Sequence, residues 1–182
     1  MARVRLLTPS EAEGDAQAIF LGMEQRGTEI INLHRALGNS PTILRNFLRL
    51  GTSLMGFGRL PPNLRELAIL RIAQMAGADY EWAHHIPLAG QAGVTEPQIS
   101  HLKDWETHGS FDDRDRATLR YVETVSRNIA VPDDIFNAAR AHLSEGEIVE
   151  LTLVCGFWGM AARLLVALQI DVEPNVRQYL PK

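Results

Sequence analysis

The chain has 182 residues, 46% of them apolar, and a formal net charge of -4 at pH 7. This length and composition are typical of a globular domain with a buried core and exclude a disordered or fibrous chain. The net charge is slightly negative and the charged residues are interspersed along the chain, so nucleic acid is not expected as a partner.

Helical periodicity dominates the chain. Apolar side chains recur at three- and four-residue spacing, and Gly, Pro, Ser and Asp stand at the expected boundaries. In chain order, the expected helices cover residues 11–26, 29–37, 42–55, 64–76, 80–92, 97–102, 112–129, 134–142 and 148–170. No segment sustains the alternation of a strand, so the prediction is an all-α fold in a single helical domain, residues 1–182.

Three of these segments carry specific expectations. The helix over 64–76 has so little polar surface that it should be buried at the centre of the fold. Pro87 falls in the middle of the next helix and predicts a kink or an early end. Ser144 followed by Glu147 is a capping-box pattern and announces the long apolar helix over 148–170.

Cysteine usage and hydropathy bear on where the protein works. Cys155 is the single cysteine, so no disulfide framework can form within the chain. Its apolar neighbours would not lower the pKa of its thiol, so it is not expected to be a nucleophile. The first residues lack the apolar run of a secretory signal, and no apolar stretch is expected to reach the about 18 residues that span a bilayer. We therefore expect a cytoplasmic protein without a membrane partner.

The segment from Glu66 to His85 carries the candidate chemistry. Glu81 and His85 stand four residues apart, so on a regular helix they share a face and can form a hydrogen-bonded pair. Such a pair orients an imidazole for general acid or base catalysis. Glu66 can reach His85 only if the chain folds back at residues 77–79. The alternatives are a solvated surface pair, and a first-turn Glu66 that only favours the helix dipole.

Other side chains near this segment are secondary candidates. Tyr80, Trp82 and His84 could contact a substrate, although aromatic side chains more often pack in a core. His84, His85 and Glu81 include metal-ligand types, but adjacent helical residues point about 100° apart, so no metal site is expected. The remaining histidines show no ligand spacing and are expected in packing or at the surface: His34, His101, His108 and His142.

This segment resembles the carboxymuconolactone decarboxylase family, which includes the alkylhydroperoxidase D-like proteins. The likeness covers about residues 40–170. The peroxidase branch has a glutamate, eleven residues, a cysteine, two residues, a second cysteine, three residues and a histidine. In this chain Glu66 and His85 stand at the glutamate and the histidine, whereas Ala78 and Glu81 replace the cysteines. A thiol peroxidase is therefore not expected, because alanine and glutamate cannot cycle through a sulfenate and a disulfide.

The resemblance implies an alkylhydroperoxidase D-like helical domain, assembled as a homotrimer or homohexamer, with a site at a subunit interface and no cofactor. It implies decarboxylation or proton transfer on a small unsaturated carboxylic acid or lactone, as in aromatic compound catabolism. We assign His85 as the proton donor, Glu81 as its orienting partner and Glu66 as a second acid. Arg71 would bind a substrate carboxylate. An isomerase, a lactone hydrolase and a non-catalytic helical oligomer remain open.

Overall fold

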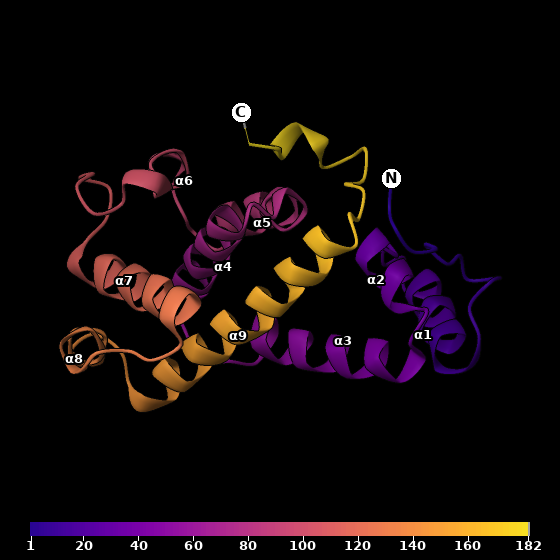
Figure 1. The fold of residues 1–182 in the computed structure, drawn as a ribbon, viewed down its shortest axis with the longest axis horizontal. Helices are drawn as coiled ribbons and strands as arrows, with labels where there is room; N and C mark the ends of the chain where they lie inside the picture. The colour runs from indigo at the N-terminus through magenta and orange to yellow at the C-terminus, as the bar shows by residue number, and fades with distance from the viewer. Residues whose placement is uncertain (182) are drawn as a thin grey trace.

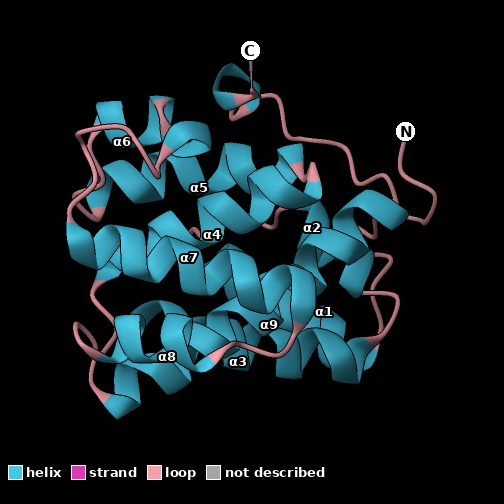
Figure 2. Ribbon diagram, turned by 60° about the vertical axis from the view of Figure 1, so that its left-hand side comes forward, coloured by secondary structure: helices cyan, strands magenta, loops and turns pink. Residues whose placement is uncertain are grey.

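The computed structural model describes residues 1–181, and every regular element in them is a helix (Figure 2). The elements are α1 (Gly14–Gln25), α2 (Asn32–Leu37), α3 (Pro41–Gly56), α4 (Pro62–Ala76), α5 (Asp79–Gln91), α6 (Glu96–Ser100), η1 (Leu102–Asp104), α7 (Asp113–Asn128), α8 (Asp133–Arg140), α9 (Glu145–Ala167) and η2 (Arg177–Tyr179). The predicted all-α fold is confirmed, and each expected helix has a counterpart. The largest differences at a start are three residues, in α1, α2 and α9, which begin at Gly14, Asn32 and Glu145 rather than residues 11, 29 and 148.

Helix α4 lies at the centre of the fold, as its apolar sequence predicts. Every residue from Leu64 to Ala73 is buried, Glu66 among them. The helix packs against α5, α7 and α9, and these four helices form the core (Figure 1). It ends at Gly77, whose positive φ of 61° is a left-handed conformation that glycine adopts without strain.

The turn at residues 77–78 folds the chain back, so that α5 runs alongside α4. Helix α5 continues through Pro87 to Gln91, so the predicted early end is wrong. Proline removes one backbone donor, but α5 is packed on both sides of it, since Ala83 and Ala89 are fully buried. The hairpin of α4 and α5 is thus a rigid platform for the side chains that it carries.

Helix α9 begins with the predicted capping box. Ser144 accepts from the backbone N–H of Glu147, and the Glu147 carboxylate accepts from the backbone N–H of Ser144. By length and composition α9 could cross a membrane, contrary to the expectation that no stretch would reach that length. Half of its most apolar stretch is buried inside the protein, as in an ordinary core helix.

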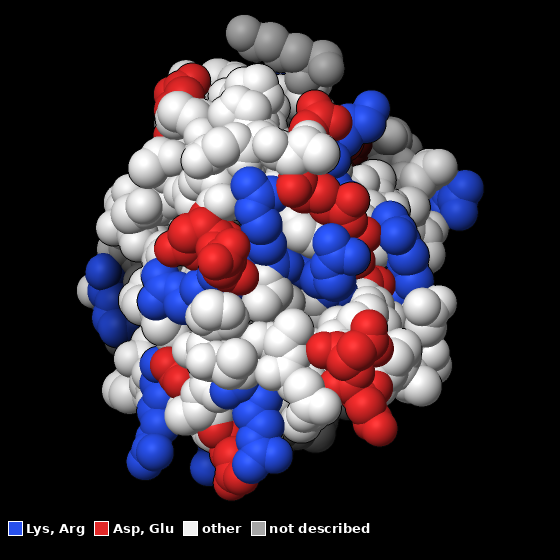
Figure 3. Space-filling model, turned by 90° about the vertical axis from the view of Figure 1, so that its left-hand side faces the viewer, with Lys and Arg blue, Asp and Glu red and all other residues white. Residues whose placement is uncertain are grey.

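The remaining elements cover the two ends of this core. Helices α1, α2 and α3 lie at one end around a second apolar cluster that includes Phe20 and Leu44. Helices α6 and α8 lie at the other end, beside α7 (Figure 1). There, basic and acidic side chains are interspersed rather than gathered into a surface of one sign (Figure 3). The C-terminal segment returns across α5, where η2 contacts it.

Candidate functional site

A cavity of about 530 Å³ lies between α2, α3, α5 and α9. Its walls are mostly apolar, with aromatic side chains from Phe47, Phe157 and Trp158. Its ionisable lining residues are His34, Tyr80, Glu81, His84 and His85, and no arginine or lysine belongs to the lining in the described part of the chain. Two other hollows are larger, but neither is lined by a histidine. The cavity at His85 is therefore the candidate active site.

Both ring nitrogens of His85 are engaged. Nδ1 lies 2.8 Å from Oε2 of Glu66, and Nε2 lies 3.0 Å from the indole Nε1 of Trp158. An indole N–H can only donate, so Nε2 accepts and carries a lone pair. The proton of the neutral ring is therefore on Nδ1, from which it is donated to Glu66. The geometry fixes one tautomer of His85 in the cavity wall.

Glu66 is fully buried in the centre of α4. Its second oxygen, Oε1, accepts from Nε of Arg65 at 3.2 Å. Arginine stays charged in proteins, so this neighbour compensates for burying the carboxylate beside His85. The turn at residues 77–78 thus brings a buried, partnered acid from α4 against the imidazole on α5.

Glu81 does not form the expected pair with His85. Its side chain is 3% exposed, and neither carboxyl oxygen has a hydrogen-bond partner. The reason is that Glu66 and Trp158 already occupy the two ring nitrogens of His85. Burial raises the pKa of Glu81 well above its ordinary value, because no partner compensates the charge of its carboxylate.

His84 and Tyr80 line the cavity but bind the C-terminal segment. Oε2 of Glu173 lies 2.7 Å from Nε2 of His84, and Oε1 accepts from the Tyr80 hydroxyl at 2.7 Å. The backbone N–H of Asn32 also donates to Glu173. Burial opposes the charge, but the hydrogen bonds from His84, Asn32 and Tyr80 prevail and lower the pKa of Glu173 to about 2. Glu173 therefore joins α2, α5 and the C-terminal segment.

His34 also contributes to the cavity lining, from α2. Its Nδ1 is buried without a hydrogen-bond partner, and burial lowers the pKa of the ring to about 4. The ring is consequently neutral at physiological pH. His34 adds a polar group to the cavity without adding a charge.

Two predicted substrate contacts lie outside the cavity. The guanidinium of Arg71 points to α7, where its Nε donates to Glu123 at 2.7 Å, so Arg71 is not available to a substrate there. Trp82 packs against a small cluster of Ala73, Ala78 and Ala162. Their positions on α4 and α5 direct both side chains away from His85.

The sequence model of the Carboxymuconolactone decarboxylase family matches residues 41–124, a range that holds Glu66, Glu81 and His85. Over these residues, slightly less than half of its length, the chain is similar to that family. The uncharacterized protein YdfG of Bacillus subtilis (strain 168) is 30% identical over 92 residues, which are 50% of this chain and 63% of that protein. The chain thus spans less than two thirds of this curated relative.

Solved structures show the same fold. An uncharacterized peroxidase-related protein from Ralstonia eutropha JMP134, described as an alkylhydroperoxidase AhpD core, has a TM-score of 0.82 at 18% identity, covering 100% of this chain and 98% of its own. The debrominase Bmp8, solved with 2,3,4-tribromopyrrole, has a TM-score of 0.80 at 22% identity, covering 97% and 94%. The alkylhydroperoxidase D-like fold is therefore confirmed.

The site lacks the cysteine nucleophiles that the thiol chemistry of the peroxidase branch requires. Ala78 and Glu81 stand at the two cysteine positions. Cys155 is buried on α9 outside the lining of the His85 cavity, and burial raises the pKa of its thiol to about 12. Within residues 1–181, no three His, Cys, Asp or Glu side chains lie close enough together to hold a metal ion. The site offers acid–base chemistry.

Sequence reasoning missed Trp158 and Glu173. Both lie after residues 41–124, which the family model matches: Trp158 is 73 residues after His85, and Glu173 is 89 residues after His84. Trp158 stands in an apolar run of α9, where a tryptophan is expected to pack. A local signal for either contact is missing from the sequence, because each depends on how α9 and the C-terminal segment cross α5.

Proposed function

We propose that the chain catalyses proton transfer at carbon in a small unsaturated carboxylic acid or lactone, with His85 as the acid–base residue and Glu66 orienting it. The observation that carries this proposal is the arrangement Glu66–His85–Trp158 in the wall of an apolar cavity. A buried carboxylate holds the imidazole in one tautomer and stabilises the imidazolium that forms on protonation. Similarity to the carboxymuconolactone decarboxylase family supports it too, because decarboxylation of an unsaturated lactone ends with a proton delivered to carbon.

The resting tautomer suits a reaction that begins with proton removal. Nε2 of His85 takes a proton from the carbon beside the substrate carbonyl, and the C–H electron pair enters the conjugated system as an enolate. The Nδ1 proton stays hydrogen-bonded to Glu66. The imidazolium then returns the proton to another carbon of the enolate, which gives an isomer and restores the neutral ring.

Trp158 has a part in both steps of this scheme. Its indole N–H must leave Nε2 of His85 before that nitrogen can take a proton. Once released, the same N–H can donate to the oxygen on which the enolate charge develops, in a mostly apolar site where such a hydrogen bond is strong. Trp158 would therefore cap the base at rest and stabilise the charge during turnover.

Decarboxylation would use the same groups with a different first step. The bond to the carboxylate carbon breaks, its electron pair enters the dienolate, and Nε2 of His85 must already carry the proton that is delivered. In the resting tautomer the proton is on Nδ1, so a further proton has to enter from solvent. The arrangement thus supports a proton shift more directly than a decarboxylation.

Proton exchange and isomerisation of α-angelica lactone in D₂O test the proposal, followed by ¹H NMR. We expect wild type to exchange the ring proton next to the carbonyl, and His85→Gln to lose about 10²–10⁴-fold of that rate. His142→Gln, which changes an exposed histidine outside the cavity, should keep the wild-type rate. Equal rates in wild type and His85→Gln would mean that His85 is not the acid–base residue.

A further inference from the structure

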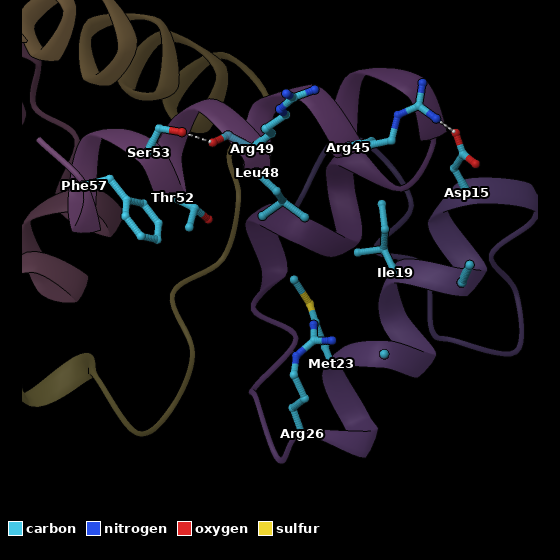
Figure 4. A pocket seen from close by; sticks show the side chains of 12 residues that line it. Asp15, Ile19, Met23, Arg26, Arg45, Leu48, Arg49, Thr52, Ser53 and Phe57 are labelled. Carbon is cyan, nitrogen blue, oxygen red and sulfur yellow. Dashed lines mark hydrogen bonds and ion pairs between the residues drawn. The ribbon is translucent and has the colours of Figure 1, made fainter.

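A groove of about 670 Å³ lies between α1 and α3, next to the His85 cavity (Figure 4). Met23, Leu48 and Thr52 line both hollows. In Figure 4, Met23 from α1 and Leu48 from α3 point toward one another across the gap between the helices. The cavity and the groove therefore adjoin, with these shared side chains between them.

The groove is basic, whereas the cavity is not. Arg26, Arg45 and Arg49 line the groove, and the one acidic lining residue, Asp15, lies 2.9 Å from Arg45. Within residues 1–181, Arg26 and Arg49 have no ion-pair partner. The groove thus holds two uncompensated guanidinium groups, which favour carboxylate ligands because of their planar donor geometry.

The cavity, by contrast, is a poor place for an anion. Its lining includes no arginine or lysine, His34 is neutral, and the carboxyl group of Glu81 is already buried without a partner. Desolvating a carboxylate there would leave its charge uncompensated, which is costly. An acid that enters the cavity should therefore keep its charged end outside.

Apolar groups in the groove can cover the part of a ligand between these two ends. Ile19 and Leu48 belong to its lining, and the ring of Phe57 is 82% exposed beside them. Gly22 leaves room for Arg26, because a Cβ at that position would lie 3.3 Å from Nη1 of the guanidinium. The groove therefore combines an apolar surface with two free cations.

We infer that the substrate is an elongated amphipathic acid: its unsaturated, carbonyl-bearing end occupies the His85 cavity, and its carboxylate lies in the basic α1–α3 groove, where Arg26 and Arg49 supply uncompensated positive charge. This inference rests on the proposed function for the identity of the reacting end. A carboxylate held in the groove is remote from His85 and is retained in the product. The reaction on such a substrate is then a proton shift rather than a decarboxylation.

Binding of 6-phenylhexanoate and its uncharged analogue 6-phenylhexanamide, measured by calorimetry at low ionic strength, tests this inference. The phenyl group fits the apolar cavity, and the two compounds differ in charge alone at the far end. We expect wild type to bind the acid about fivefold to tenfold more tightly, because the arginines are exposed and each contact is partly screened. The double variant Arg26→Gln/Arg49→Gln should bind acid and amide equally, with the amide affinity unchanged.

Two control variants make the result specific to the groove. Arg140→Gln removes an exposed arginine elsewhere and should keep the preference for the acid. Arg26→Lys/Arg49→Lys retains the positive charge and should keep most of the preference for the acid. Equal binding of acid and amide by wild type would overturn the inference. So would a preference that persists in the double glutamine variant, is lost in Arg140→Gln, or disappears together with amide binding.

The outcome is separable from that of the proposed function. Neither compound reacts, so the preference for the acid does not depend on catalysis and should survive in His85→Gln. If turnover proves independent of His85 while the preference holds, the groove binds acids and the proposed chemistry is wrong. If turnover requires His85 but the preference is absent, the chemistry stands and the groove does not bind the carboxylate.

Discussion

Two adjacent histidines of α5 each bind a buried glutamate, yet the two pairs have different surroundings. His85 pairs with Glu66 of the neighbouring helix α4 and accepts a second hydrogen bond from Trp158. His84 pairs with Glu173 of the C-terminal segment, and that carboxylate also accepts from Tyr80 and the backbone of α2. A histidine–carboxylate pair therefore does not identify an acid–base site. What distinguishes the two pairs is which other groups contact the carboxylate and the second ring nitrogen of the histidine.

By that criterion the pair of His85 and Glu66 is suited to proton transfer. The lone pair on Nε2 of His85 accepts from Trp158 in the cavity wall, whereas Glu173 accepts from donors on two helices and ties the C-terminal segment to α5. The first pair should govern turnover and the second should govern stability. Substitutions in each carboxylate can separate the two roles.

The largest effect is expected for Glu66→Gln. A neutral amide cannot stabilise the imidazolium of His85, and it can reverse the tautomer by donating to Nδ1. We expect the rate of lactone proton exchange to fall by about 10²–10⁴-fold. Glu81→Gln is the matched control, because it changes the other cavity carboxyl and should leave the rate within about threefold. A Glu66→Gln rate close to wild type would remove the distinction between the two histidine–carboxylate pairs.

The next effect is a loss of stability in Glu173→Gln, with turnover nearly unchanged. Weakened hydrogen bonds to a charged group should lower the free energy of unfolding by about 1–3 kcal/mol, measured by urea denaturation at neutral pH. The pKa of Glu173 is lowered from 4.5 to about 2, so its ionisation stabilises the fold above about pH 4.5. That contribution is lost as the pH falls toward 2.

The stability difference between wild type and Glu173→Gln should therefore shrink between about pH 4.5 and pH 2. Denaturation at several pH values in this window measures the trend. A stability difference that stays constant with pH would mean that the charge of Glu173 does not stabilise the fold. A large loss of lactone exchange in Glu173→Gln, without unfolding, would assign the His84 pair to the chemistry instead.

The smallest effect is a gain in stability in Glu81→Gln that grows with pH. Burial raises the pKa of Glu81, so the folded protein keeps a proton that the unfolded chain releases above about pH 4.5. Wild type therefore loses stability as the pH rises from that value, and glutamine, which does not titrate, avoids the loss. We expect the melting temperatures of wild type and variant to be similar near pH 4.5 and the advantage of the variant to increase as the pH rises toward 8. A variant that is less stable at the higher pH would show that Glu81 is ionised in the fold.

The sequence predicts those features of the fold that depend on residues close together in the chain. Helical periodicity predicts the α-helices, the Ser144–Glu147 capping box predicts the start of α9, and the apolar composition of α4 predicts its central position. Glycine at position 77 indicates the turn that makes a contact between Glu66 and His85 possible. These features follow from residues close together in the chain.

What could not be predicted depends on contacts between distant segments. Helical spacing favours Glu81 as the partner of His85, but the partner is chosen by the packing of α4 and α9 against α5. Likewise, the sequence does not indicate the direction of the Arg71 side chain, because its partner Glu123 lies on the distant helix α7. The sequence does not indicate that Arg26 and Arg49 could bind a ligand, because they become neighbours of the cavity only when α1 packs on α3.

The tautomer of His85 is the central physical claim, and long-range ¹H–¹⁵N correlation NMR of the histidine side chains at neutral pH measures it directly. We predict a neutral ring with the proton on Nδ1 and an unprotonated Nε2, as the donor from Trp158 requires. Assignment by loss of the signal in His85→Gln makes the result specific. A ring protonated on Nε2, or on both nitrogens, would contradict the arrangement on which the proposed chemistry depends.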